Sequence, residues 1–291
     1  MRVLVTGANG QLGHDVVNEL KKRGHEAIRT DIAGDMDYLL DITNEDVIDS
    51  IVHINPDAII HCAAWTAVDA AEDEENKEKV YAINVTGTKN IVEAADQLGC
   101  KLLYLSTDYV FDGQGTEPWK PDEKLYDPLC YYGETKLLGE KAVSKLEKFF
   151  IVRIAWVFGL NGKNFIKTMI NVGKTHDEVR VVNDQIGTPT YTYDLSRLLV
   201  DMIESDKYGF YHATNEGGFI SWYDFCLEIY RQVGLDTKVI PVSTIEYGLS
   251  KAKRPFNSRL DKSKLSENGF ERLPDWKDAL SRYLKEIDYG K

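Results

Sequence analysis

The sequence lacks an excess of positive charge and any long run of apolar residues. Across its 291 residues, 35 lysines and arginines stand against 47 aspartates and glutamates, a formal net charge of −12. A surface with this balance does not attract the phosphate backbone of a nucleic acid, so we expect no nucleic-acid partner. No stretch reaches the roughly 18 consecutive apolar residues of a transmembrane helix, so we expect no membrane span.

Cysteine and histidine are also scarce. The six histidines show none of the spacings typical of metal ligands, so we expect no metal site. The N-terminus opens on an apolar segment without the layout of a signal peptide. The four cysteines lie far apart and form no C-x-x-C pair, which indicates reduced thiols in a cytoplasmic protein; they are Cys62, Cys100, Cys130 and Cys226.

What the chain does contain, at its start, is a short strand, a glycine-rich turn and a helix. G-A-N-G-Q-L-G follows the apolar residues 2–6 and places glycines at Gly7, Gly10 and Gly13. Such glycines allow a tight turn and leave the first N–H groups of the helix free to bind a pyrophosphate. The spacing differs from the more common G-x-G-x-x-G, and an ordinary tight turn remains the alternative to a dinucleotide site.

Asp31 supplies the acid that a dinucleotide site requires. It ends a second predicted strand, residues 25–31, and lies 24 residues after Gly7, near the spacing of a carboxylate that binds the adenosine ribose. A carboxylate there favours a free 2′-hydroxyl and hence NADH, whereas Arg29 could tolerate the 2′-phosphate of NADPH. The sequence leaves both cofactors open, and a solvated strand end is the alternative for Asp31.

Strands and helices continue to alternate over the first half of the chain. Further strands are predicted at 39–43, 58–64, 101–106 and 149–157, and helices at 44–54, 76–98 and 128–145. This alternation is typical of an α/β fold with a Rossmann-type, doubly wound parallel sheet. From residue 160 the elements become shorter. We therefore expect a dinucleotide-binding domain over 1–158 and a smaller α+β substrate-binding domain over 159–291, with some later segments returning to the first.

The most informative stretch is D-P-L-C-Y-Y-G-E-T-K, residues 127–136. Asp127 and Pro128 predict the start of a helix, which would place Tyr132 and Lys136 one turn apart on one face. An ammonium group about 4–5 Å away would lower the pKa of a tyrosine from about 10 by roughly 2–3, so Tyr132 could exchange a proton near neutral pH. A surface pair without function is the alternative.

Five longer motifs connect these features. They are S-T-D-Y-V-F-D-G at 106–113, Y-G-E-T-K at 132–136, R-I-A-W-V-F-G at 153–159, D-Q-I-G-T-P-T at 184–190 and R-P-F-N-S-R-L at 254–260. With the glycines they resemble the extended short-chain dehydrogenase/reductases, and within them the dTDP-4-dehydrorhamnose reductase family. The resemblance implies reduction of a 4-keto nucleotide sugar by NADPH or NADH, the last step of dTDP-L-rhamnose synthesis, by a monomer or homodimer.

The resemblance also implies roles for single residues. Tyr132 would give a proton to the C4 oxygen, Thr107 would hold that oxygen, and Lys136 would hold the nicotinamide ribose and lower the pKa of Tyr132. Asp108 and Trp156 would face the sugar. The positions expected to line the dinucleotide are Gly7, Gly10, Gln11, Leu12, Gly13, Asp31, Asp41, Ile42, Ala63, Ala64, Thr66, Tyr132 and Lys136.

Two of the substrate assignments and the metal expectation have alternatives. Arg254, in the basic cluster K-A-K-R, is expected to contact the diphosphate because its planar fork matches phosphate oxygens, but the cluster could also be a solvated loop. Trp156 could be an ordinary core tryptophan. Some family members hold magnesium between subunits. Asp15 is an acid in the first helix, but no further ligands match, so we expect no metal.

Three other functions remain open. A nucleotide-sugar 4,6-dehydratase uses adjacent acid and base side chains after the strand-end threonine, whereas Asp108 is followed by Tyr109. A sugar 4-epimerase would keep Tyr132 and Lys136. A non-catalytic, NADP-binding regulatory subunit belongs to a different class, and the intact Thr107, Tyr132 and Lys136 argue against it.

Overall fold

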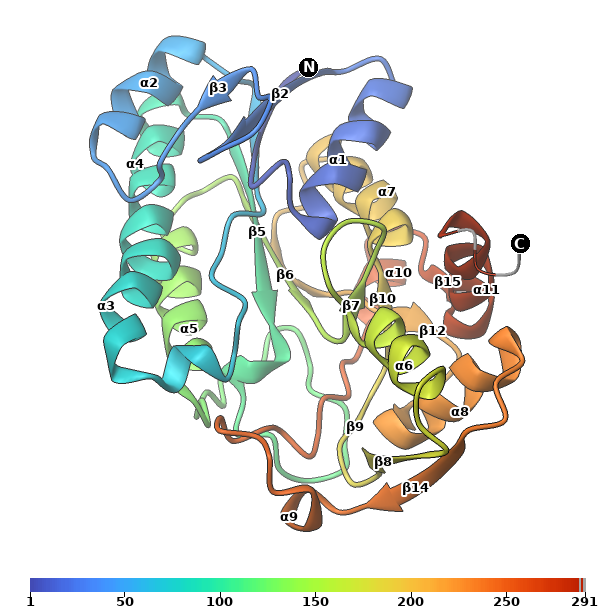
Figure 1. Ribbon diagram of the computed structural model, residues 1–291. Helices are drawn as coiled ribbons and strands as arrows, with labels where there is room; N and C mark the ends of the chain where they lie inside the picture. Colours follow the sequence, from blue (N-terminus) through green and yellow to red (C-terminus); the bar gives the residue numbers. More distant parts are fainter. Residues whose placement is uncertain (288, 290–291) are drawn as a thin grey trace.

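A seven-stranded parallel sheet forms the centre of the protein (Figure 1). The structure is a computed structural model that describes residues 1–287 and residue 289. The strands are β1 (Arg2–Thr6), β2 (Glu26–Asp31), β3 (Tyr38–Leu39), β4 (Ala58–His61), β5 (Lys101–Thr107), β6 (Phe149–Ile154) and β11 (Gly209–His212). Their order is β11-β6-β5-β4-β1-β2-β3, and every pairing is parallel. The predicted Rossmann-type α/β fold is confirmed, with the strand order reversing between β1 and β4, where such sheets bind ligands.

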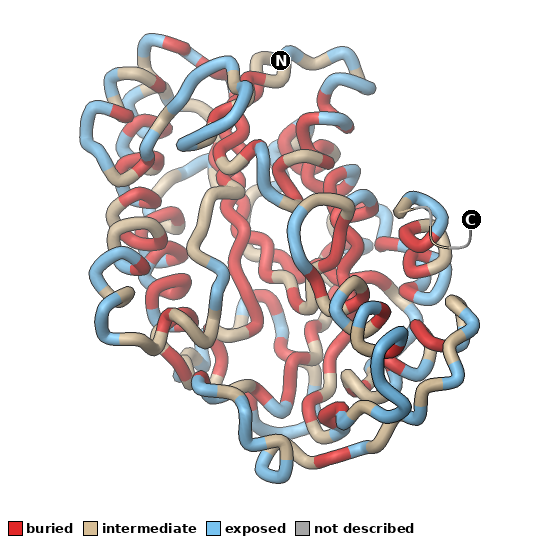
Figure 2. Tube along the Cα trace, in the orientation of Figure 1, coloured by how far each residue is buried: buried red, intermediate tan, exposed pale blue. Residues whose placement is uncertain are grey.

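Helices cover both faces of this sheet. One face is covered by α1 (Gln11–Lys22) and α7 (Thr192–Ile203), and the other by α2 (Asp46–Ile54), α4 (Thr88–Leu98) and α5 (Tyr131–Val143). Because side chains alternate along a strand, Val3 and Val5 pack with the first pair of helices and Leu4 with the other three. The sheet is therefore buried on both faces, as Figure 2 shows along its strands, which explains its near-continuous apolar runs.

The second half of the chain builds a smaller lobe around its own core. Its longer elements are α6 (Phe165–Gly173), β8 (Glu178–Val182), α8 (Trp222–Val233), β14 (Lys238–Val242) and α11 (Trp276–Glu286). Side chains of α6, β8, α8 and α11 form one buried cluster, and the partly buried Val239 of β14 packs against it. The short elements are β7 (Val157–Phe158), β9 (Ile186–Gly187), β10 (Thr190–Tyr191), β12 (Asn215–Glu216), β13 (Ile220–Ser221), α9 (Thr244–Tyr247), α10 (Ser263–Glu267) and β15 (Leu273–Asp275). The strand β11, from the second half of the chain, joins the central sheet. The domain boundary expected near residue 158 stays a prediction.

Several predicted elements have different limits. The helix expected over 76–98 is α3 (Glu74–Tyr81), a π-helical turn (Ala82–Gly87) and α4. In the π-turn, the Asn84 side chain accepts the Trp65 N–H at 2.8 Å and donates to the Thr135 hydroxyl at 3.0 Å. Wider turns of this kind often lie near functional sites. The strands expected over 39–43, 58–64 and 149–157 end early, at Leu39, His61 and Ile154.

The predicted start of the helix that carries Tyr132 is wrong. The helix α5 begins at Tyr131, after an extended Cys130, and not at Asp127 or Pro128. Glu72 provides the reason, because its carboxylate accepts the Tyr131 N–H at 2.7 Å. A residue distant in sequence thus satisfies a free N–H group of the first turn, which places Tyr132 at the very start of the helix.

Candidate active site

The glycine turn between β1 and α1 is an open cradle for an anion. Gly7 has a left-handed φ of 64°, and a Cβ there would lie 2.8 Å from the Ala63 nitrogen. A Cβ on Gly13 would lie 2.1 Å from the Gly7 oxygen, so only glycine fits. The first turn of α1 has no side-chain cap and no acidic residue, and its N–H groups are available to a phosphate.

A cavity of about 420 Å³ extends from this turn to α5. The Ser106 hydroxyl on its wall is buried and has no hydrogen-bond partner among the residues that the structure describes. The cradle and this unpaired hydroxyl fit a bound dinucleotide. Among the predicted residues, those that line the cavity are Gly7, Gly10, Gln11, Leu12, Gly13, Ala64, Thr66, Thr107, Asp108, Tyr132, Lys136 and Trp156.

Four predicted cofactor residues lie outside this cavity. Asp31 stands at the end of β2, and Asp41 accepts the Thr43 N–H and hydroxyl. The Ile42 side chain is buried against Gly87, and Ala63 donates its N–H to Thr6. Contact of these four residues with the cofactor stays a prediction. The Ile42 side chain does not line the cavity, so a contact of Ile42 with the cofactor would have to come from its backbone.

Close packing at the start of α5 brings Tyr132 to the carboxyl end of β5. A Cβ on Gly133 would lie 2.4 Å from the Tyr109 oxygen, so this glycine lets the helix approach the turn after Thr107. The rings of Tyr109 and Tyr132 meet edge to face at 5.6 Å. The Thr107 hydroxyl donates to Asp108 at 3.0 Å and accepts the Tyr109 N–H at 3.3 Å, and it lines the same cavity as Tyr132. The structure thus brings Thr107, Asp108 and Tyr132 together.

The expected effect of Lys136 on Tyr132 is wrong in this structure. Burial raises the pKa of Tyr132 well above 10, with the Asp108 carboxylate adding to the shift and the Thr107 hydroxyl opposing it. Lys136 points over the ring of Tyr104, 4.1 Å from its centroid. Burial lowers the pKa of Lys136 to about 7, and the carboxylate of Glu140 opposes this shift. Tyr132 is therefore a neutral phenol at physiological pH, the form that can donate a proton.

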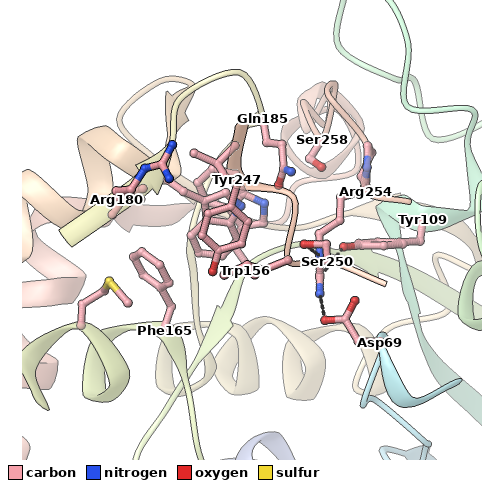
Figure 3. A pocket seen from close by; sticks show the side chains of 16 residues that line it. Asp69, Tyr109, Trp156, Phe165, Arg180, Gln185, Tyr247, Ser250, Arg254 and Ser258 are labelled. Carbon is pink, nitrogen blue, oxygen red and sulfur yellow. Dashed lines mark hydrogen bonds and ion pairs between the residues drawn. The ribbon is translucent and has the colours of Figure 1, made fainter. Parts of the chain in front are cut away.

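A second cavity, of about 410 Å³, adjoins the first (Figure 3). The two share Tyr109 and Trp156. Trp156 has a left-handed φ of 50°, rare for a bulky side chain and typical of functional sites. Its ring stacks on Trp222 at 3.8 Å. Trp156 therefore lies at the junction of the two cavities and is not an ordinary core residue.

Arg254 lines the second cavity but already has protein partners. It donates to Asp69 at 2.5 Å and to the Tyr109 hydroxyl at 3.1 Å (Figure 3). Asp69 also accepts the N–H groups of Lys251 and Ala252. The basic cluster is thus not simply a solvated loop, because these contacts tie it to the first half of the chain. The expected contact of Arg254 with a diphosphate stays a prediction.

Sequence reasoning missed several residues of the site. Ser258 donates its hydroxyl to Asp108 at 2.5 Å, and Glu72 and Asp69 act as described above. Ser258 lies within R-P-F-N-S-R-L, a motif interpreted above only through Arg254. Trp222 follows Ser221, whose hydroxyl caps α8, but no local pattern showed that it would meet Trp156.

Asp108 offers a test of the electrostatics of the site. Burial raises its pKa from 3.8 to about 6, against the hydrogen bonds from Ser258 and Thr107. The folded protein therefore binds this proton more tightly than the unfolded chain does, and the free energy of unfolding falls as pH rises from about 3.8 to about 6. Because one pK unit is worth about 1.4 kcal/mol, Asp108→Asn should increase the free energy of unfolding by about 1–3 kcal/mol at neutral pH.

The measurement is urea unfolding of wild type and variant across this pH range. The difference between the two should grow from near zero at acid pH and level off above pH 6. A variant that is less stable than wild type at every pH would contradict the raised pKa.

Two negative observations concern other kinds of site. Within residues 1–287 and 289, no group of three or more histidine, cysteine, aspartate or glutamate side chains is placed to hold a metal ion. Asp15 instead accepts the Thr192 hydroxyl at 2.5 Å. None of the helices that the structure describes has the length and apolar character needed to cross a membrane.

A proton donor and a dinucleotide cradle that open into one cavity are what hydride transfer to or from a carbonyl carbon requires. On this fold, they define an oxidoreductase of the extended short-chain dehydrogenase/reductase class. The family model described as RmlD substrate binding domain matches residues 1–289. The chain belongs to this family, which is that of the dTDP-4-dehydrorhamnose reductases.

Individual relatives agree over nearly their whole length. The chain is 40% identical to the spore coat polysaccharide biosynthesis protein SpsK of Bacillus subtilis, covering 98% of this chain and 97% of the relative. It is 39% identical to a dTDP-4-dehydrorhamnose reductase of Aggregatibacter actinomycetemcomitans, covering 96% and 97%. The crystal structure of dTDP-4-dehydrorhamnose reductase from Bacillus anthracis in complex with NADP has a TM-score of 0.91 at 41% identity, covering 98% and 99%.

Proposed function

We propose that this protein reduces the C4 ketone of dTDP-4-dehydro-6-deoxy-L-mannose with NAD(P)H, giving dTDP-L-rhamnose in the last step of dTDP-rhamnose biosynthesis. The observation that carries the proposal is the position of Tyr132 and Thr107. Both line the cofactor cavity beside Tyr109, which also lines the second cavity. A ketone whose nucleotide occupied the second cavity would meet the hydroxyls at this junction.

The chain supplies binding, orientation and a proton. When bound, the cofactor supplies hydride to C4. Tyr132 gives its phenolic proton to O4 as the C4–H bond forms, and Thr107 hydrogen-bonds the same oxygen as negative charge develops there. One ketone, one hydride and one proton give one alcohol, and Tyr132 regains its proton from solvent. Lys136, which also lines the cofactor cavity, would bind the nicotinamide ribose.

The aromatic second cavity suits a nucleotide. Trp156, Trp222 and Phe165 contact one another in a continuous group, and Figure 3 shows Arg180 at the same end of the cavity as Phe165. Aromatic faces and a guanidinium favour a flat base and its phosphates. At the other end, three of the five guanidinium N–H groups of Arg254 are bound by described residues, namely Ser250, Tyr109 and Asp69, which leaves two for a phosphate oxygen.

Of the other candidates, the site geometry argues against a dehydratase and a regulatory subunit, whereas a 4-epimerase is distinguished by its cofactor balance. A dehydratase needs an acid beside Asp108, and the next residue, Tyr109, points its hydroxyl at Arg254. A regulatory subunit has no need for a buried Tyr132 and Thr107 on the wall of the cofactor cavity. A 4-epimerase shares these groups, but it would return its substrate with no net change in reduced cofactor.

The test is NADH or NADPH oxidation by the purified protein with freshly prepared dTDP-4-dehydro-6-deoxy-L-mannose. We expect one mole of reduced cofactor to be consumed per mole of dTDP-L-rhamnose, identified by chromatography against a standard. Sugar interconversion without oxidation would indicate an epimerase. No turnover with either cofactor, despite cofactor binding, would indicate the regulatory subunit.

The proposed location and assembly follow from the same account. Cys62, Cys100, Cys130 and Cys226 are all free thiols, which supports a reducing, cytoplasmic environment. We propose a monomer or a homodimer, as the resemblance implies.

A further inference from the structure

The loop between β2 and β3 holds the acid expected at the adenosine ribose in a fixed position. The Asp31 carboxylate accepts the Asn9 N–H at 3.1 Å and the Ile32 N–H at 2.8 Å. The Asn9 side chain donates to the Ala33 oxygen at 2.7 Å. The glycine turn and the first residues of the loop are therefore fastened to each other, with the Asp31 carboxylate at the edge of the sheet.

The arginine that could accept a 2′-phosphate is already paired. Arg29 forms two side-chain hydrogen bonds with Asp37, at 2.9 and 3.2 Å, and Asp37 also accepts the Arg29 N–H at 2.8 Å. A further guanidinium nitrogen donates to the Asp35 oxygen at 3.1 Å. The Arg29 bonds, with a smaller effect from Lys21, hold the pKa of Asp37 below its usual value. The Arg29 guanidinium is thus held by the Asp37 carboxylate.

The rest of the loop is acidic. Residues 31–41 contain four aspartates and no lysine, arginine or histidine. A ribose diol can donate hydrogen bonds to the Asp31 carboxylate. A 2′-phosphate can only accept hydrogen bonds, and it would bring its negative charge to this carboxylate while Arg29 is already paired with Asp37.

We infer that this protein selects NADH over NADPH, because Asp31 binds the ribose 2′-hydroxyl while Asp37 withholds Arg29 from a 2′-phosphate. The inference rests on the proposed function, of which it specifies the reductant. The Bacillus anthracis relative is in complex with NADP, so we assign the selection to the side chains of this loop and not to the shared fold.

The experiment is a titration of the full-length protein with NADH and with NADPH, without sugar, followed by the fluorescence of the reduced nicotinamide. We expect NADH to bind at least about 10-fold more tightly, the scale of one uncompensated charge contact near a protein surface. Equal affinities, or tighter binding of NADPH, would overturn the inference.

Two variants identify the residues responsible. Asp37→Asn should release Arg29 and strengthen NADPH binding several-fold with little change for NADH. Asp31→Ser should weaken NADH binding and reduce the ratio of NADH affinity to NADPH affinity. Asp49→Asn, on the exposed side of α2, removes the same charge elsewhere and should leave the preference unchanged. If Asp49→Asn changed the preference as much as Asp37→Asn, the effect would be one of net charge, and the assignment would fail.

These titrations separate the inference from the proposed function. Preferential NADH binding without reduction of the sugar would refute the function and support the inference. Reduction of the sugar with equal affinity for both cofactors would support the function and refute the inference.

Discussion

Tyr132→Phe is expected to lower kcat by at least ~100-fold, the scale of a lost general acid, and to leave the affinity for NADH nearly unchanged. The hydroxyl is the only group that the substitution removes. The ring that packs edge to face on Tyr109 stays, so the shape of the cavity is preserved. Steady-state kinetics with the 4-keto sugar, together with a cofactor titration, measure the two effects separately.

The adjacent tyrosine provides a matched control. Tyr131 also lies in the first turn of α5, but its hydroxyl donates to the Lys77 oxygen at 3.3 Å, away from the cavity. Tyr131→Phe should keep kcat within about threefold of wild type. If Tyr132→Phe did the same, another group would be the proton donor.

Glu140→Ala is expected to destabilise the protein by about 3–5 kcal/mol, the cost of leaving a buried charge unpaired. Arg153 and Glu140 form two hydrogen bonds of 2.8 Å each, and their side chains are 0% and 2% exposed. The same guanidinium donates to the Pro121 oxygen and the Tyr126 hydroxyl. Removing Glu140 would therefore free the loop before α5 as well as the helix itself, and urea unfolding at pH 7 measures the loss.

An exposed pair and a double variant test the explanation. Asp122 pairs with Lys264 at 2.6 Å but its side chain is 69% exposed, so Asp122→Ala should cost less than about 1 kcal/mol. Replacing the buried pair together, by Glu140→Leu and Arg153→Met, should recover most of the stability, because the buried guanidinium is removed with its partner. If Glu140→Ala lost no more unfolding free energy than Asp122→Ala, the buried Arg153–Glu140 pair would not be the strong stabilising contact described here.

Patterns among residues close in sequence were sufficient to predict the sheet and most of the residues that line the cofactor cavity. The glycine turn, the apolar strands and the Tyr-x-x-x-Lys spacing each depend on residues close in sequence, and most of the predicted cofactor residues line one cavity. These are properties of backbone conformation and periodicity, which a short stretch of chain determines by itself.

What the sequence could not show depends on contacts between distant segments. The start of α5 is set by Glu72, 59 positions before Tyr131, so the local signal at Asp127 and Pro128 misled. The pKa of Tyr132 depends on burial and on Asp108, and neither follows from the spacing to Lys136. The pairing of Arg254 with Asp69 spans 185 positions, and charge alone could not distinguish it from a free phosphate ligand.

Transfer of a heavy isotope tests the central claim most directly. NADH carrying deuterium at both positions of the nicotinamide C4 would be incubated with the 4-keto sugar and the protein, and the sugar nucleotide analysed by mass spectrometry and NMR. We predict a product that carries one deuterium, bound to sugar C4, formed by wild type and at least ~100-fold more slowly by Tyr132→Phe. A sugar without deuterium at C4, or equal rates for the two proteins, would contradict the account.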